Sequence, residues 1–521
     1  MNNPRNLVAA IILTVAFAGS AWHVLSPDDR AAPADDRVVI RVGHWLLHAG
    51  MREAFDAAIA DYERLHPGVS VEQIPVPIRT WPAWMRTQLV GGTAPDITGL
   101  LTANEELASR HFIPLNAHIG EPNPHNAGTP LEGVPWIDTF VDGMAAMRNL
   151  TPTSGDIHAV NLQVNTLRLF YNRRLLAEVT GATEPPADYA ALRRLEEQVA
   201  RHNQKTGRHL VPIASCGPYS QYLFERLLPS QTQQLAVSLS PANTFNVQPV
   251  ELARLVLAGE LSYARTPPLR SSLDLLRDVT VLMSPGYNSR QRDDALFDFL
   301  QQRAVMICAG SWDYAVFERD GDFPVGIMPI VLPSAGDPDY GRFVLGLPSE
   351  ANGSPEATLG IVRTSKHPDI ALDFLRFLTS RRIAQKFSDM SLRMSSITTV
   401  APPERAAGLA PRLDGEIAGF MPDFNNFGGG NANLVFQHNL HLLTGREGDA
   451  GAFAQKLDEE LPAALRRDMQ IHTDRVRRDI RRLDALLGLL LTRETGHDAT
   501  SPDQILETRH VRQIEYHTYR P

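Results

Sequence analysis

The chain has 521 residues, which is enough for two or three domains with large cores. Its composition is ordinary for a globular protein, with 43% hydrophobic and 21% charged residues. The formal net charge of −9 argues against a nucleic-acid-binding protein, which would need a basic surface.

Residues 1–30 form a predicted targeting segment. Arg5 precedes an apolar run from Leu7 to Ala18, and the small residues that follow suit a cleavage site for a signal peptide. Without cleavage, the apolar stretch up to Leu25 is long enough to anchor the protein in a bilayer. Both alternatives export the folded part, so we expect a periplasmic protein, with cleavage favoured. Residues 31–37 are predicted to be a linker.

Only two cysteines, Cys216 and Cys308, are present. They could form one disulfide in an oxidising compartment. Cys308 lies in an apolar run, so a buried free thiol is the favoured interpretation there.

The first ordered elements alternate between strand and helix. Val38 to Val42 is strand-like, Met51 to Leu65 has apolar residues at helical spacing, and Val69 to Ile74 is again strand-like. This order predicts a βαβ unit in a parallel sheet. A helix over 84–90 and a strand after Pro95 follow, and Ile137 to Met147 is predicted to be helical.

Ile157 to Leu176 begins as a strand and ends as the start of a helix. Its strand-like part carries polar side chains, whereas a strand buried on both faces should be almost entirely apolar. It is therefore either a strand that passes between two lobes with polar groups facing a cleft, or an ordinary edge strand. These polar residues are Asn161, Gln163, Asn165 and Thr166.

The second half of the chain continues the alternation of helices and strands. Helices are predicted over 189–201, 222–228, 250–257, 270–282 and 293–302. Strand-like runs follow at Ala304 to Ala309 and at Phe323 to Pro333, and Gly360 to Leu378 is predicted as a strand, a turn and a helix.

Several ordered stretches within residues 38–465 resemble the extracellular solute-binding proteins of ABC importers, of the maltose-binding-protein type. They are His66-Pro-Gly-Val with Gly91-Gly-Thr-Ala-Pro-Asp-Ile, the stretch Ala159 to Leu176, the run Ala295 to Trp312 ending in Gly-Ser-Trp, and Leu359 to Ser380.

The resemblance implies an α/β fold of two lobes, the type II periplasmic binding protein fold, with hinge strands near Gln163 and Gly326. The N-terminal lobe would comprise residues 38–163 and 328–395, and the C-terminal lobe residues 164–327 and 396–465. Such a protein would be a monomer that captures a carbohydrate by hinge closure and delivers it to the transmembrane subunits of an ABC permease. Membrane contact would occur only through the N-terminal segment or the permease.

Residues 466–492 are predicted to form an extra helix rich in arginine, and residues 493–521 a flexible tail. The helix either packs on the second lobe with a solvated basic face, or docks on a partner or an anionic membrane surface. The histidines of the tail lack the spacing of a metal site.

Carbohydrate recognition requires aromatic platforms and planar polar groups in a cleft. Trp312 lies where the family's tryptophan stacks on ligand, and Trp45 and Trp84 are further candidates, each with a core position as the alternative. The polar candidates are Asp96, Thr98, Gln163, Asn165, Asp313, Arg393 and Asn425. Asp96 could instead cap a turn, Asp313 a helix, and Arg393 lies where the family usually has a Gly-x-x-Pro segment.

We find no sequence signature of an enzyme, a metal site or a phosphate loop, and no cofactor is expected. Two alternatives to a transport role stay open at this point. One is a hydrolase or lyase of glycans on the same scaffold, and the other is a sugar sensor tethered to the membrane by its N-terminal segment.

Overall fold

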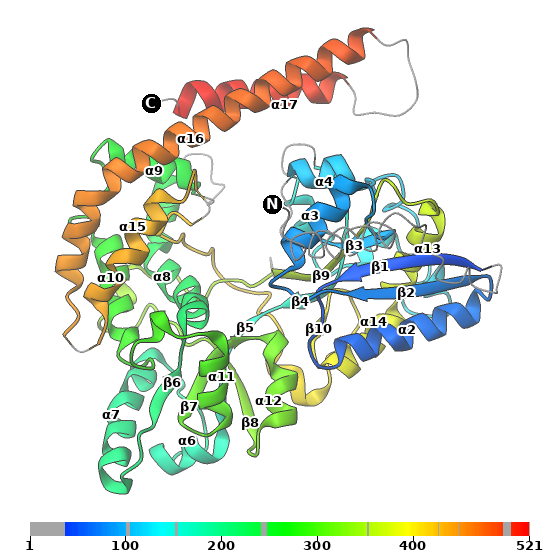
Figure 1. Cartoon of the computed structure of the whole chain (residues 1–521). Coiled ribbons are helices and arrows are strands. Elements are labelled where there is room, and N and C mark those ends of the chain that lie inside the picture. The colour runs from blue at the N-terminus through cyan, green and yellow to red at the C-terminus, as the bar shows by residue number, and fades with distance from the viewer. Residues whose placement is uncertain are drawn as a thin grey trace, which may run out of the picture.

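The computed structural model describes residues 37–100, 105–151, 155–240, 247–351, 354–425, 427–445, 447–492 and 502–519. They form two α/β lobes, each built around its own sheet (Figure 1). The expected targeting segment, and the linker up to residue 36, lie outside the described residues. No helix in the described ranges is both long and apolar enough to cross a membrane.

The first lobe contains a six-stranded sheet in the order β10-β4-β9-β3-β1-β2. β1 pairs in parallel with β2 and β3, and β9 runs antiparallel between β3 and β4. The predicted βαβ unit is confirmed, because α2 (Met51–Leu65) connects β1 to β2. The strands are β1 (Val38–His44), β2 (Val69–Pro75), β3 (Ile97–Gly99), β4 (Val160–Asn165), β9 (Ser354–Ile361) and β10 (Met394–Ser395).

Helices cover this sheet through aromatic contacts. Phe55 of α2 meets Phe387 edge-to-face with ring centroids 4.9 Å apart, and Tyr62 meets Phe374 at the same distance. The apolar spacing predicted for α2 therefore forms its buried face. The other helices of this lobe are α3 (Trp81–Gly91), α4 (Glu105–His111), α5 (Ala145–Arg148), α13 (Pro368–Leu378) and α14 (Arg381–Ser391).

The single helix predicted over 137–147 is wrong. The chain forms a 3-10 turn at Trp136–Thr139 and then the short α5. Gly143 and Met144 separate them with φ values of 56° and 57°, in the left-handed region that ends a right-handed helix.

The second lobe contains a four-stranded sheet in the order β6-β7-β5-β8. Its central strand β7 is buried at every position, as its apolar sequence predicts. The strands are β5 (Leu167–Asn172), β6 (Val211–Ala214), β7 (Ala304–Gly310) and β8 (Val325–Pro329). The helices are α6 (Arg173–Thr180), α7 (Tyr189–Thr206), α8 (Gly217–Leu239), α9 (Pro249–Leu257), α10 (Pro267–Thr280), α11 (Arg292–Leu300), α12 (Tyr314–Asp320) and α15 (Asn431–Asn439).

The predicted passage of the chain between lobes occurs at Thr166, which alone separates β4 from β5. Two further passages lie beside it. Arg168 of β5 forms a bidentate ion pair with Glu350, at 2.9 and 3.0 Å, and donates to the carbonyl oxygen of Ala410. Because Glu350 precedes β9 and Ala410 follows β10, this buried guanidinium ties all three passages together. We call this part of the molecule the crossing region.

The lobe boundaries expected at residues 328 and 396 require correction. Met328 pairs with Leu169 of β5, and Ile330 and Leu332 belong to the core of the second lobe. Ile397 instead pairs with Phe140 and belongs to the core of the first lobe. Both passages therefore lie later in the chain than the resemblance implied.

Two long helices follow the second lobe. α16 (Ala450–Thr492) begins well before the predicted residue 466 and contains Pro462. It curves over the top of the second lobe (Figure 1). The expected flexible tail is also wrong, because residues 502–519 form α17 (Pro502–Tyr519), which packs antiparallel on α16. His472 and Glu515 join the two helices with a 3.1 Å contact between Nε2 and Oε1.

Candidate functional site

The crossing region brings several of the predicted polar residues together. Gln163 of β4 donates from Nε2 to Ser391 Oγ (2.8 Å) and accepts from Arg393 Nη1 (3.4 Å). Arg393 is 1% exposed and forms an ion pair with Glu356 Oε2 at 2.7 Å. Its Nη2 donates to the carbonyl oxygen of Trp312 at 3.3 Å, so one side chain of the first lobe contacts the second lobe directly.

Trp312 lies in a 3-10 turn (Ser311–Asp313) between β7 and α12. The indole folds back over Gly310, where a Cβ atom would come within 2.2 Å of the ring. It is half-buried and meets Tyr222 of α8 edge-to-face, with ring centroids 5.5 Å apart. Asn165 lies beside this turn, because its Oδ1 accepts from Ser311 Oγ at 3.3 Å. The turn therefore offers part of an aromatic surface at the crossing region.

Asp313 is fully buried and holds two groups of the second lobe. It forms an ion pair with Arg292 of α11 and accepts from Tyr219 Oη at 2.8 Å. Burial raises the pKa of Asp313, although Arg292 opposes the shift. The side chain of Arg292 is 39% exposed, so the buried carboxylate orients a guanidinium that still reaches solvent.

His48 of the first lobe lies close enough to Arg393 and Arg292 to be affected by their charges. Burial, followed by repulsion from Arg393 and then Arg292, lowers the pKa of His48 to about 3. The imidazole is therefore neutral near pH 7, and its Nδ1 is buried without a hydrogen-bond partner. Neither His48 nor Arg292 stands out in the sequence, because nothing local to them indicates a site.

Two carboxylates, Asp423 and Glu225, lie close to Tyr222 and its neighbour Gln221. Asp423 is 1% exposed, accepts from the backbone N–H of Asn425 (3.1 Å) and from Gln221 Nε2 (3.4 Å), and has a pKa raised by burial. The pKa of Glu225 is raised by desolvation and then by Asp423, although its side chain still reaches solvent. Carboxylates with few partners suit hydroxyl or ammonium donors of a ligand.

The predicted candidates of the first lobe lie in its core or at its edge. Trp45 is 5% exposed and packs on Trp81 with ring centroids 5.3 Å apart, and Trp84 is half-buried beside the same ring. Asp96 accepts from Arg41 N (3.0 Å) and Ser365 Oγ (2.7 Å), so its carboxylate joins β1 to the segment after β9, a structural role that differs from the turn cap expected as its alternative.

Thr98 is fully buried, and its Oγ1 has no hydrogen-bond partner. Asn425, in contrast, is exposed on the loop that carries Asp423. These two predicted residues therefore lie in different lobes and in different surroundings.

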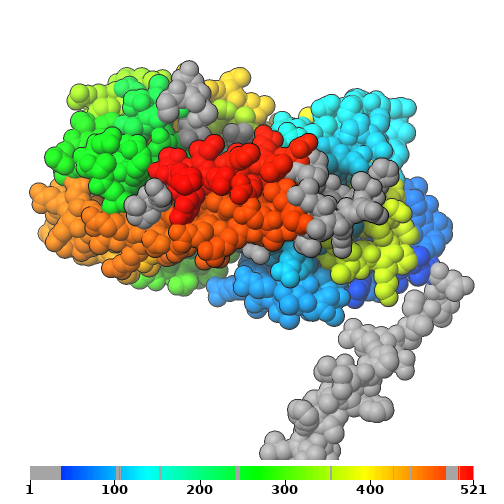
Figure 2. All heavy atoms as spheres, turned by 90° about the horizontal axis from the view of Figure 1, so that it is seen from above, coloured from blue at the N-terminus to red at the C-terminus, as the bar shows by residue number. Residues whose placement is uncertain are grey.

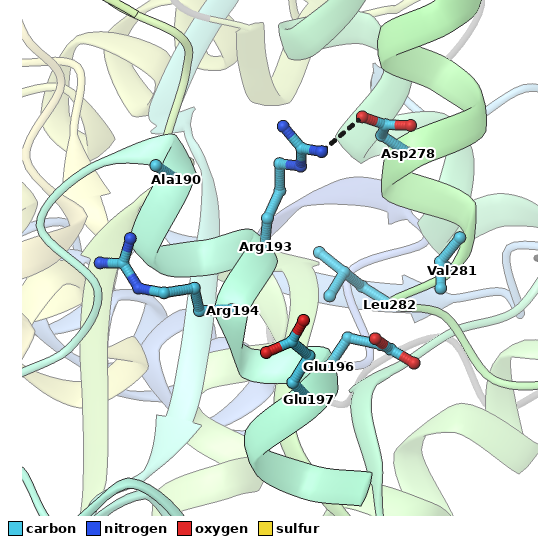
Figure 3. Close-up of a pocket in the computed structure, with 8 residues that line it drawn as sticks. All are labelled: Ala190, Arg193, Arg194, Glu196, Glu197, Asp278, Val281 and Leu282. Carbon is cyan, nitrogen blue, oxygen red and sulfur yellow. Dashed lines mark ion pairs between the residues drawn. The ribbon is translucent and has the colours of Figure 1, made fainter. Parts of the chain in front are cut away.

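A well-defined hollow lies elsewhere, on α7 and α10 of the second lobe, with a volume of about 380 Å³ (Figure 3). Its lining is highly charged, and Arg193 reaches across it to Asp278 at 3.1 Å. This hollow contains none of the residues of the crossing region, so the two are separate candidates for a functional site.

Comparison with known proteins gives a consistent result. Residues 57–409 match a family model described as bacterial extracellular solute-binding protein. An uncharacterised ABC transporter extracellular-binding protein of Pyrococcus horikoshii is 20% identical over 376 residues, which cover 71% of this chain and 75% of that protein.

Solved structures share the fold at lower identity. A solute-binding protein in complex with raffinose has a TM-score of 0.55 at 15% identity, covering 82% of this chain and 100% of its own. The maltotriose-binding protein of Thermus thermophilus, solved with maltotriose, has a TM-score of 0.53 at 14% identity, with 82% and 100% coverage.

Proposed function

Because this chain belongs to the bacterial extracellular solute-binding protein family, we propose that it captures a carbohydrate, of oligosaccharide size, between its two lobes. The site would be the crossing region together with the wall formed by Trp312, Tyr222 and the carboxylates of Asp423 and Glu225. The captured ligand would then pass to the permease subunits of an ABC importer, outside the cytoplasm.

The observation that carries this proposal is the half-buried Trp312, held by groups from both lobes. Its ring meets Tyr222 of the second lobe, and its carbonyl oxygen accepts from Arg393 of the first. A change in the angle between the lobes therefore acts directly on the surroundings of the indole. A ligand that contacts both lobes stabilises the closed form, because only that form makes both sets of contacts.

The side chains around Trp312 suit a carbohydrate. Sugars present apolar C–H faces, which stack on indole rings, and rims of hydroxyl groups. Glu225, which reaches solvent, can accept hydrogen bonds from hydroxyls, and the exposed part of Arg292 can donate to them. Hydrogen-bond acceptors and donors for sugar hydroxyls therefore both lie near one aromatic surface.

The test is a thermal-shift and calorimetric screen of the purified protein against mono- and oligosaccharides. A ligand present at 100 times its dissociation constant should stabilise the protein by about 2.7 kcal/mol. We expect Trp312→Ala to abolish this shift while the variant stays folded. Phe297→Ala is the matched control, since that aromatic ring is 50% exposed on α11 and should leave binding unchanged.

Two results would contradict the proposal. One is the absence of any stabilisation across a broad saccharide panel, and the other is binding of wild-type strength by Trp312→Ala. Release of product from a labelled polysaccharide would point instead to an enzyme on this scaffold.

A further inference from the structure

The hairpin of α16 and α17 lies beyond residues 57–409, the part of the chain that matches the family model. The first half of α16 packs on α9, α10 and α15, and Tyr519 at the end of α17 packs against the core of the second lobe. The hairpin is therefore rooted in the second lobe at both ends. Viewed from above, it lies across the face where the two lobes meet (Figure 2).

One side of α16 carries a row of arginines, which we call the arginine stripe: Arg467, Arg475, Arg478 and Arg482. At 100° per residue these positions fall within an arc of about 80°. All four residues are exposed. The buried Val476 and Thr473 point away from this arc. At its N-terminal end the arc borders the 428–431 loop, which Asp468 and Ile471 contact. The stripe extends along the helix for about 22 Å.

Most of these guanidiniums form no ion pair with the described part of the chain. Among the described residues, no carboxylate lies within ion-pair distance of Arg467, Arg478 or Arg482, and Arg475 donates only to the carbonyl oxygen of Gly428, at 3.4 Å. Neighbouring arginines behave differently. Arg509 pairs with Asp484, and Arg512 with Glu515 at 2.6 Å, inside the hairpin. Burial raises the pKa of the half-buried Asp479, and Arg512, Arg482 and Arg475 oppose that shift, so part of the stripe lies near a carboxylate with which it forms no ion pair. The stripe is therefore a set of positive charges that are only partly compensated, on a chain of net charge −9.

Apolar side chains lie among these charges. Ile471 is 37% exposed and Leu486 is 39% exposed, and both fall on the same side of α16 as the stripe. A helix side that combines arginines with exposed aliphatic groups fits the boundary between lipid headgroups and acyl chains. A soluble anion would gain nothing from the aliphatic groups.

We propose that the arginine stripe binds the anionic phospholipid surface of a membrane. Guanidiniums form paired hydrogen bonds with phosphate groups, and a row of them matches the charge of a lipid layer. The C-terminal hairpin would thus contact the membrane in addition to the contacts expected from the sequence, which are the N-terminal segment and the permease. It does not depend on the identity of the ligand in the crossing region.

The experiment measures co-sedimentation of the full chain with vesicles of phosphatidylcholine alone or with 30 mol% phosphatidylglycerol, at about 0.02 and 0.5 M NaCl. Each basic residue near such a surface contributes about a five-fold factor to partitioning. We expect binding to require phosphatidylglycerol and to be lost at high salt. Phosphatidylcholine vesicles account for any insertion of the N-terminal segment, which does not need anionic lipid.

The variant replaces Arg467, Arg475, Arg478 and Arg482 by Gln, and we expect it to lose at least ten-fold in phosphatidylglycerol-dependent binding. A control variant carries the same change at four exposed arginines elsewhere, Arg86, Arg201, Arg382 and Arg405, and should lose less than three-fold.

Equal losses in the two variants would mean only a general effect of net charge, and would overturn the proposal. So would the absence of phosphatidylglycerol-dependent binding by the unmodified chain. Competition by 5 mM inorganic phosphate that abolishes vesicle binding would assign the stripe to a free anion instead. Circular dichroism melts confirm that both variants are folded.

Discussion

The buried ion pair of Arg393 and Glu356 allows a quantitative prediction of how a substitution in the crossing region changes the free energy of unfolding. Both side chains are almost inaccessible to water, at 1% and 8% exposure. Replacing Arg393 by Met leaves the carboxylate of Glu356 buried without its counter-charge. Losing one partner of a buried pair destabilises a protein by about 3–5 kcal/mol. We therefore expect Arg393→Met to lower the free energy of unfolding by an amount in that range.

The double variant Arg393→Met/Glu356→Leu removes both charges and should recover much of this loss, because two apolar side chains replace the pair. A double-mutant cycle, measured by urea unfolding at pH 7 with circular dichroism, isolates the coupling between the two residues. We expect a coupling of at least about 2 kcal/mol.

A matched control is the pair of Arg319 and Asp320, whose side chains are 62% and 41% exposed. Exposed pairs couple by about 0.2–1 kcal/mol. If the cycle at Arg393 and Glu356 gave a coupling no larger than this surface pair, the reasoning from burial would be refuted. Arg393 would then regain its place as a candidate for direct ligand contact.

Three further predictions concern titration and thiol chemistry. Burial raises the pKa of Asp423 above its unfolded value of 3.8, so ionising this carboxyl lowers the stability of the folded protein as the pH rises above 3.8. In thermal melts, Asp423→Asn should therefore be more stable than wild type at pH 7 and equally stable at pH 3. Burial alone would raise the pKa of Asp373, but hydrogen bonds from His125 and Tyr62 lower it. Asp373→Asn should therefore lose about 1–2 kcal/mol at pH 7 and almost nothing near pH 2 in urea unfolding, and an equal loss at both pH values would contradict this. Cys216 and Cys308 are buried free thiols whose pKa is raised by burial, so iodoacetamide should label them only after unfolding, and a reductant should leave the melting temperature unchanged.

Periodicity within short stretches of the sequence predicted those helices and strands whose formation depends on neighbouring residues. The βαβ unit of β1, α2 and β2 follows from helical and strand periodicity in adjacent stretches. The polar side chains of this strand left a passage between lobes and an edge strand open, and the family resemblance placed a hinge near Gln163, three residues before the passage at Thr166. The prediction of one helix over 137–147 was wrong because two consecutive residues, Gly143 and Met144, adopt positive φ. Nothing in the sequence indicates a positive φ at a Met.

Contacts between distant residues explain the larger errors. α17 is polar in sequence, and its helix is stabilised by pairing with α16 through groups such as His472 and Glu515. The apolar run at Phe323 to Pro333 marks a strand correctly, but only its pairing with β5 assigns that strand to the second sheet.

The site shows the same division. Trp312, Gln163, Asn165, Asp313 and Arg393 were expected near a cleft, and the structure gathers them at the crossing region. Whether a polar group is free for a ligand depends on its partners, and these come from remote parts of the chain. Arg393 is already paired with Glu356, whereas Arg292 and His48 lie beside it without any local sequence signal.

The rooting of α16 also has a mechanical consequence. Its 43 residues follow a curved axis of about 64 Å, whose first half is part of the second lobe while its second half extends over the first lobe. Any rotation of the second lobe about Thr166 is magnified at the far end of this lever. A pair of fluorophores, one on the far end of α16 and one on α3, would therefore convert the angle between the lobes into a large change in energy transfer. The same lever would resist rotation wherever its outer half is held.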